Sequence, residues 1–334
     1  MSKNIITIVC ICLLFSCSNH KTTEFEADRT ITLNNNAIYD ISRFGILYPL
    51  SIDLSNNELL ILDDNNTKLL KVINLNGEFI NSCANIGRGP NEFNQITSID
   101  YENNIIGVYD QGFKCYTNIY ADNTFKREWK NDLELDMARK ICDSMFICSA
   151  VHDSTALYLL NYNGDIVDRN EMFPPKPNSI PLISHSMACS GYLSTYEHSP
   201  FFVRSVVYDG GLDVFKIENN KIIHKWRFSN FDMDYDIIKE YDKVPKPNDR
   251  TRKGYRSISM GKDNIFGLFS GSNIIGENLS SSNEIHVFDY EGKHISKIIL
   301  DKFVKCIAVN KEQSKLVTIQ IDDKEGVFIL IYEI

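Results

Sequence analysis

Residues 96–123 read ITSIDYENNIIGVYDQGFKCYTNIYADN and contain three short runs rich in apolar residues. The first run ends at Asp100, the second extends from Ile105 to Asp110, and the third extends from Cys115 to Tyr120. Asn, Asp and Gly residues separate the runs, and these residues favour turns. The stretch therefore predicts three consecutive antiparallel strands.

The same order of runs and turns recurs along the chain, and this recurrence decides the fold class. It is visible from Pro49 to Gly77, from Ser257 to Gly292 and from Lys305 to Ile334. The turn after the third run falls at Asn76-Gly77, Asp122-Asn123, Asn163-Gly164, Glu218-Asn219-Asn220 and Glu291-Gly292. The first three of these turns are roughly 42–46 residues apart, which is the spacing of four-stranded propeller blades.

Six such units start near residues 48, 95, 138, 185, 256 and 303. The sequence thus predicts an all-β fold, a six-bladed β-propeller with four-stranded blades. The last unit has only three runs before Ile334, while a strand-like run from Arg29 to Leu33 is left over. We expect this N-terminal strand to close the ring, because closure limits exposed sheet edges. An open pair of β-sheets is the alternative.

Two stretches, about residues 173–199 and 231–255, lengthen the fourth and fifth intervals of the repeat. Each contains a Pro-Lys-Pro-Asn run, at residues 175–178 and 245–248. Proline lacks the N–H group that a sheet ladder needs, so these runs indicate exposed loops. We expect one propeller domain over residues 28–334 with these two insertions.

The chain begins with a basic start at Lys3 and a nearly unbroken apolar run over residues 5–15, which is typical of a secretory signal. The run is shorter than the roughly 20 residues that cross a membrane. Leu14-Phe15-Ser16-Cys17 resembles the bacterial lipobox, in which the cysteine thiol receives a diacylglycerol. We expect residues 1–16 to be a lipoprotein signal peptide and residues 17–27 to be a tether anchored through Cys17. The alternative is an ordinary signal peptide with an incidental cysteine.

The net charge of the chain is −9, and removal of Lys3 with the signal peptide would change it to −10. Nucleic-acid binding depends mainly on basic groups that contact phosphates, and the sequence has no stripe of Lys and Arg. The expected partners are therefore the lipid bilayer, reached through acylated Cys17, and a component of the envelope, with no nucleic acid. We expect a monomer.

Six cysteines remain beyond Cys17, and they are scattered singly through the chain. They are Cys83, Cys115, Cys142, Cys148, Cys189 and Cys306. No CxxC pair and no Cys/His spacing typical of zinc is present. An exported compartment permits disulfides, but single cysteines within apolar runs favour small buried side chains.

The junction between the first two units reads IGRGPNEF over residues 86–93. With the two strands after it, this segment resembles the NHL-type propeller repeat and, more closely, the TolB-like six-bladed propeller lipoproteins of Bacteroidetes. The resemblance implies a six-bladed ring and no particular activity, because propellers host many functions. Asn91 stands where such motifs often have glycine, and we expect it to alter one turn. Surface-exposed lipoproteins of Bacteroidetes carry acids directly after the cysteine. The first acid here is Glu24, which favours a periplasm-facing anchor.

Five charged residues are candidates for a ligand site in a central funnel. Arg88 and Glu92 belong to the glycine-rich junction, Arg204 interrupts an apolar strand, and Arg43 and Arg256 precede the first strands of their units. Converging arginines would bind a carboxylate or phosphate, which Arg recognises with two parallel hydrogen bonds. The alternative is structural: these side chains pair with acids or with loop backbone.

Two further groups could suggest chemistry, but neither matches a known pattern. The acid-rich turn at residues 63–66 could bind calcium through oxygens, but the EF-hand spacing is absent. His185 and His198 lie near Ser184, Ser186 and Cys189, but no nucleophile elbow accompanies them. We therefore expect no catalytic residue, metal or cofactor.

The sequence favours a lipid-anchored cell-envelope propeller that acts as a binding or scaffold module for a protein, peptide or glycan. The alternative is a propeller-type hydrolase or lyase with an active site in the central funnel. A cluster of acidic and histidine side chains beside a pocket would favour the enzyme. A funnel filled by Phe and Leu side chains would exclude it.

Overall fold

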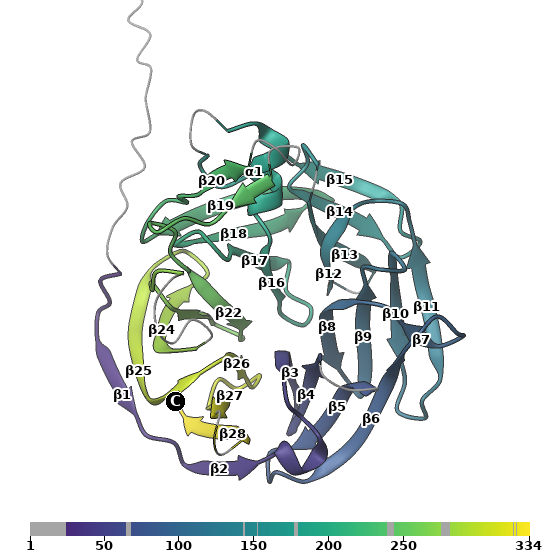
Figure 1. Cartoon of the computed structure of the whole chain (residues 1–334), viewed down its shortest axis with the longest axis vertical. Helices are drawn as coiled ribbons and strands as arrows, with labels where there is room; N and C mark the ends of the chain where they lie inside the picture. Colours follow the sequence, from purple (N-terminus) through teal and green to yellow (C-terminus); the bar gives the residue numbers. More distant parts are fainter. Residues whose placement is uncertain are drawn as a thin grey trace, which may run out of the picture.

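The computed structural model describes residues 25–64, 68–142, 144–151, 153–176, 180–238, 244–274, 281–322, 324 and 326–334. These residues form six β-sheets arranged as blades around a central axis (Figure 1). The predicted six-bladed, all-β propeller is confirmed. The predicted signal peptide, Cys17 and most of the tether lie outside the described residues.

The four main strands of each blade pair antiparallel, and the first of them lies nearest the axis. Blade 1 comprises β3 (Pro49–Ser55), β4 (Glu58–Asp63), β5 (Lys68–Asn74) and β6 (Phe79–Ile86), with the short β7 (Glu92–Phe93) at its outer edge. Blade 2 comprises β8 (Ile96–Glu102), β9 (Ile105–Asp110), β10 (Cys115–Ile119) and β11 (Phe125–Lys130). Blade 3 comprises β12 (Leu135–Ile141), β13 (Met145–Ala150), β14 (Leu157–Asn161) and β15 (Ile166–Asn170).

The remaining three blades follow the same order. Blade 4 comprises β16 (Gly191–Thr195), β17 (Phe201–Val206), β18 (Gly211–Glu218) and β19 (Lys221–Ser229). Blade 5 comprises β22 (Tyr255–Met260), β23 (Asn264–Phe269), β24 (Ser282–Asp289) and β25 (His294–Val304). Blade 6 comprises β26 (Cys306–Val309), β27 (Lys315–Asp322) and β28 (Gly326–Glu333), and an N-terminal strand completes it.

The N-terminal segment closes the ring, but not with the strand that the sequence suggested. The outermost strand of blade 6 is β2 (Ala37–Asp40), which pairs antiparallel with β28. The expected run forms β1 (Thr30–Leu33), which instead pairs parallel with β25 as a fifth strand of blade 5. The segment therefore ties two neighbouring blades together. The prediction of closure is confirmed, and the assignment of the closing strand is wrong.

Hydrophobic side chains fill the space between blades. Among the described residues, six of the seven clusters of buried side chains lie between neighbouring blades, one for each pair around the ring, and the seventh joins the two insertions to blade 4. Between blades 1 and 2, for example, Leu60 and Val72 pack with Ile99 and Val108. Since both faces of most blades are buried, the strands read as apolar runs rather than as strict alternations.

An aspartate at the end of a second strand fixes the start of the first strand in blades 1 and 2. Asp63 accepts hydrogen bonds from the backbone N–H groups of Leu47 and Tyr48 and pairs with buried Lys71 at 2.9 Å. Asp110 accepts hydrogen bonds from the N–H groups of Asn94 and Gln95. The Asp63 carboxylate thus has a structural role, which favours the structural interpretation of this acid-rich turn.

The first insertion is shorter than expected. Residues 173–199 include the helix α1 (Leu182–Ala188), but they also include β16, the inner strand of blade 4. The second insertion contains a hairpin of β20 (Asp236–Ile238) and β21 (Val244–Lys246). Its second strand includes Pro245, so one proline of the Pro-Lys-Pro-Asn run lies in a short hairpin rather than in a loop. None of the helices in the described ranges is long and apolar enough to cross a membrane.

Candidate functional site

A cavity of about 90 Å³ lies at the axis of the ring, at one of its two faces. All six inner strands point the same way around the ring, so their C-terminal ends meet at this face. We call the cavity and the side chains that line it the axial mouth. Every blade contributes to it, and the lining includes four acids and three basic residues: Asp53, Asp100, Glu102, Glu197, Arg139, Lys140 and Lys311. The funnel is therefore polar and charged, not filled by Phe and Leu.

Asp53, Asp100 and Arg139 form an ionic array across three successive blades. Each is the fifth residue of its inner strand, β3, β8 or β12, so the repeat brings the three side chains together. Arg139 Nη2 lies 2.9 Å from Asp53 Oδ2, and Arg139 Nε lies 2.6 Å from Asp100 Oδ1. The Tyr116 hydroxyl donates a 2.6 Å hydrogen bond to Asp100 Oδ2.

The two carboxylates of the array differ in their surroundings. Burial raises the pKa of Asp53 to about 6, although the Arg139 guanidinium lowers it and the Asp100 charge raises it further. Burial opposes the charge on Arg139, but Asp100 and Asp53 outweigh this effect and raise the Arg139 pKa. The array thus places a carboxyl group with a raised pKa beside the cavity.

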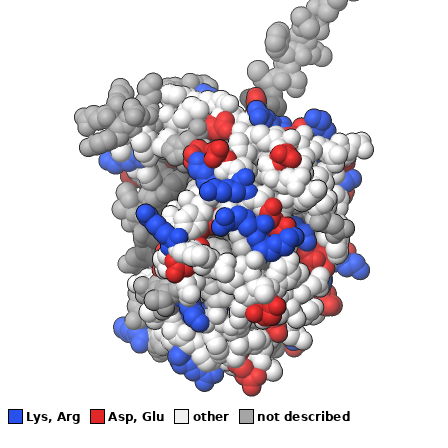
Figure 2. All heavy atoms as spheres, turned by 90° about the vertical axis from the view of Figure 1, so that its right-hand side faces the viewer, with Lys and Arg blue, Asp and Glu red and all other residues white. Residues whose placement is uncertain are grey.

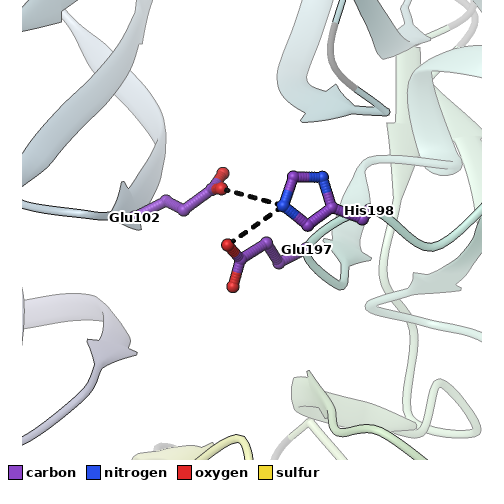
Figure 3. A group of neighbouring side chains, drawn as sticks. All are labelled: Glu102, Glu197 and His198. Carbon is purple, nitrogen blue, oxygen red and sulfur yellow. Dashed lines mark ion pairs between the residues drawn. The ribbon is translucent and has the colours of Figure 1, made fainter.

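A second group of side chains lies at the rim of the mouth, where Glu102, Glu197 and His198 point toward one another (Figure 3). Glu102 is the last residue of β8, whereas Glu197 and His198 belong to the turn between β16 and β17. His198 Nε2 is 3.2 Å from Glu197 Oε1 and 3.9 Å from Glu102 Oε1. One donor atom from each of the three side chains lies within 4.8 Å of the other two.

Lysines hold the outer oxygens of the two glutamates. Lys311 forms an ion pair with Glu197 Oε2, and Lys140 Nζ lies 3.9 Å from Glu102 Oε2. The Oε1 atoms, by contrast, face His198. The Asn103 amide also donates toward both Oε1 atoms, at 3.3 and 3.5 Å. The rim therefore has fixed carboxylates with one oxygen of each directed inward.

The glycine-rich junction lies at the outer edge of blade 1, away from the axis (Figure 1). Glu92 accepts a 2.6 Å hydrogen bond from the backbone N–H of Gly89, so its carboxylate braces the loop. Asn91 has a φ of 63°, the left-handed conformation that Asn tolerates better than most residues. Asn91 therefore forms the kind of turn that glycine would favour. Arg88 lies in the same outer loop.

The other candidate arginines are equally dispersed. Arg43, in the 3₁₀ helix η1 (Ser42–Phe44), donates to the Gly77 carbonyl and covers the Phe44 ring at 4.7 Å. Arg256 is on the inner strand β22, but at the end opposite the axial mouth. The five predicted residues do not converge on one funnel.

Arg204 takes part in a buried ionic network within blade 4. Its guanidinium lies 3.2 Å from Asp213 and donates to the Met172 carbonyl in the first insertion. Arg227 lies 2.7 Å from Asp213 and also pairs with Asp209. Burial would raise the Asp213 pKa, but Arg227, His224 and Arg204 hold this pKa well below its usual range. The network connects three strands and an insertion, as the structural interpretation predicted.

The histidine and cysteine of the first insertion are held in structural roles. His185 Nε2 lies 2.8 Å from the Pro174 carbonyl, which can only accept, so this nitrogen carries the proton. Nδ1 then accepts from the Tyr235 hydroxyl at 2.9 Å. Burial raises the pKa of Cys189 to about 12, so its thiol is not activated. His198 lies far from this pair in the fold, at the axial mouth.

No disulfide joins any two of the six cysteines that the structure describes, and five of the six are buried. The outer edge of the ring beside blades 2 and 3 carries basic and acidic side chains close together (Figure 2). On β11, for example, Lys126 lies 3.0 Å from Glu128.

The residues of the axial mouth were not among the sequence candidates, although one signal for them is present. Ser-Ile-Asp occurs at residues 51–53 and again at 98–100, at matching places in two units. An aspartate repeated on the inner strand indicates an axial position. The Glu102, Glu197 and His198 group gives no such signal, because Glu102 lies about 95 residues before the adjacent Glu197 and His198 and no repeated pattern links them.

Comparison with known proteins agrees with the fold. The family described as "TolB-like 6-blade propeller-like" matches residues 24–312. A candidate exported protein of Bacteroides fragilis is similar in structure, with 14% identity, a TM-score of 0.58, and coverage of 91% of this chain and 99% of that chain. The Cps50 (Swd1) β-propeller domain of Myceliophteria thermophila has 8% identity and a TM-score of 0.51, over 86% of this chain and 96% of that chain. At these identities the likeness concerns the fold alone. No curated protein matches the sequence.

Proposed function

Since the chain belongs to the TolB-like six-bladed propeller family, we propose that it is a lipid-anchored binding module of the bacterial cell envelope. The lipobox-like Leu14-Phe15-Ser16-Cys17 supports export and acylation at Cys17. The Bacteroides fragilis protein of similar fold, described as a candidate exported protein, fits the same location. The absence of acids between Cys17 and Glu24 favours an anchor that faces the periplasm.

The observation that carries the binding role is the axial mouth, where all six blades contribute to one charged cavity. Its carboxylates and cations are held by one another and by backbone groups, so the site is preorganised. Preorganised polar groups lose little entropy when a ligand binds. A rigid ring of this kind presents the same site whatever the state of its outer loops.

The size of the mouth indicates the class of partner. A cavity of about 90 Å³ is well below the roughly 300–1,000 Å³ of sites that enclose a small organic ligand. It has room for one polar or basic side chain. We propose that a protein or peptide inserts such a side chain and that the loops around the mouth supply the rest of the interface. A stable interface needs about 1,000 Å² or more of buried area.

Site-specific photo-crosslinking in the native envelope tests this role. A photoreactive residue replaces Lys140, which lines the mouth and is 41% exposed. The control replaces exposed Lys302, which lies near the opposite end of blade 5. We expect a protease-sensitive adduct from position 140 alone. Identical adducts from both positions, or none, would refute the proposal, and a protease-resistant adduct would indicate a glycan partner instead.

A second candidate function, hydrolysis or elimination at the same mouth, is supported by Asp53 and by the Glu102, Glu197 and His198 cluster beside the cavity, the kind of cluster that favours an enzyme. Burial raises its pKa to about 6 beside the cavity, which suits a general acid or base near neutral pH. This alternative predicts that the purified chain converts the captured partner into products and that Asp53→Asn abolishes the conversion. A binding module leaves the partner intact.

A further inference from the structure

The rim of the axial mouth combines the donor types that a divalent transition metal prefers. Glu102 and Glu197 offer carboxylate oxygens, and His198 offers an imidazole nitrogen. Bonds of about 2.1 Å at tetrahedral or octahedral angles place neighbouring donor atoms roughly 3.0–3.5 Å apart. The distance from His198 Nε2 to Glu197 Oε1, 3.2 Å, already falls in this range. The 3.9 Å distance to Glu102 Oε1 requires only a small rotation of the Glu102 side chain.

We propose that Glu102, Glu197 and His198 bind one divalent transition-metal ion, with zinc as the best match. The mixed nitrogen and oxygen donors select against calcium and magnesium, which prefer oxygen alone. Three protein ligands also match catalytic and ligand-binding zinc sites, in which water or a substrate completes the coordination. Such a metal would bind a carboxylate or carbonyl oxygen of a molecule in the mouth.

The groups around these donors support a cation at this place. Lys311 and Lys140 engage the Oε2 atoms, so they orient both carboxylates while leaving Oε1 toward His198. Partners outside the ligands fix ligand orientation in many metal sites. The four acids that line the mouth also outnumber its three basic residues. This excess of negative charge favours a cation over an anion in the mouth.

The three donors are open to solvent on one side and are carried by two different blades. His198 is 64% exposed, so an ion can reach the site from solvent. Glu102 ends an inner strand of blade 2, whereas the other two donors lie in a tight turn of blade 4. An ion would therefore bridge two blades across the end of blade 3. This inference rests on the three donors and not on the proposed partner.

The experiment uses the full chain, purified in detergent and stripped of metal with EDTA. Titration with ZnCl₂ by calorimetry should show one ion per chain, and Co²⁺ should give visible d–d absorption from a nitrogen and oxygen site. His198→Ala and Glu102→Gln should each weaken binding by more than the roughly 10–100-fold typical of lost outer partners. Glu134→Gln, which alters an exposed glutamate 62% accessible to solvent, is the matched control and should bind as the unaltered chain does.

Two results would overturn the metal site. One is the absence of saturable Zn²⁺ binding in the unaltered chain. The other is an unchanged isotherm in both His198→Ala and Glu102→Gln, which would assign the ion to another place. His198 lies in an exposed turn, so its variant should keep the thermal unfolding midpoint, and a loss of binding there cannot be attributed to misfolding. Crosslinking at position 140 reports separately on the partner.

Discussion

At the scale of single residues, the repeat and the site are linked through Asp53, Asp100 and Arg139. Their shared position on three inner strands means that one geometric rule places all three at the axis. Blades 1 and 2 carry aspartate at this shared position, and blade 3 carries arginine. The opposite charges therefore form an ionic array. A charged residue at this position therefore indicates the axial site, which the hydrophobic pattern alone does not locate.

The pKa of Asp53 leads to a prediction about stability. Because burial raises this pKa to about 6, above the value near 3.8 of a free aspartate, the protonated form is favoured in the fold. The protonated Asp53 side chain therefore adds to the free energy of unfolding at low pH, and this contribution is lost as the pH rises through 6. Relative to Asp53→Asn, the free energy of unfolding of the unaltered chain should fall by on the order of 1 kcal/mol between pH 5 and pH 7.5. Chemical denaturation at both pH values measures this difference.

Asp132→Asn is the control for this measurement, because Asp132 is exposed in the loop before blade 3. Its stability difference from the unaltered chain should stay flat over the same pH range. A difference for Asp53→Asn that is also flat, or that changes in the opposite direction, would show that Asp53 is not held as the structure indicates.

At the scale of elements, the two N-terminal strands differ in what they complete. β1 adds a fifth strand to a blade that already has four, whereas β2 supplies the missing fourth strand of blade 6. Tyr39 on β2 also lies against Gly77, where any Cβ would come within 2.6 Å of its ring. β2 is therefore part of the ring, and β1 is a brace on its outside.

Truncation should separate these two roles. A chain that begins at residue 35 loses β1 and buried Phe25 but keeps β2, so it should unfold at a lower temperature yet remain monomeric. A chain that begins at residue 41 exposes the edge of β28, and unpaired edges recruit other chains. We expect it to self-associate in light scattering after size exclusion. Equal behaviour of the two truncations would contradict the assigned closing strand.

The sequence was sufficient for the number of blades but not for the pairing of the N-terminal strands. The predicted unit starts near residues 48, 95 and 256 lie within one residue of observed inner strands, because Asn, Asp and Gly turns are local signals. The run from Arg29 to Leu33 is strand-like and left over by the repeat, which predicts an N-terminal closing strand but not its partner. Which sheet edge a strand joins depends on long-range packing, and local pattern does not encode it. The rim donors were missed for the same reason.

At the scale of the whole molecule, the N-terminus enters the ring from the side of the axial mouth. β1 runs parallel to β25, which starts at this face, and Phe25 stacks on His294 at the start of β25. Cys17 and Phe25 are eight positions apart in the sequence, so a fully extended chain between them spans at most about 26–29 Å. Anchoring at Cys17 would hold the mouth close to the membrane surface.

Lipid attachment can be tested at this scale. Cys17→Ala should abolish incorporation of radiolabelled palmitate and move the chain from the membrane fraction to the soluble fraction of the envelope. Cys10→Ala, within the predicted signal peptide, should leave both properties unchanged. Palmitate incorporation that persists in Cys17→Ala would place the acyl chains elsewhere.

The pairing of β2 with β28 also sets the order of events during biosynthesis. Ala37 pairs with Ile331, so β2 must wait for a strand that is made about 290 residues later. Contacts of such long sequence separation form late and slow the folding reaction. The ring cannot close on the ribosome before the last strand has emerged. If the chain is exported as proposed, a ring that is still open would let it pass unfolded through a secretion channel and close on the far side.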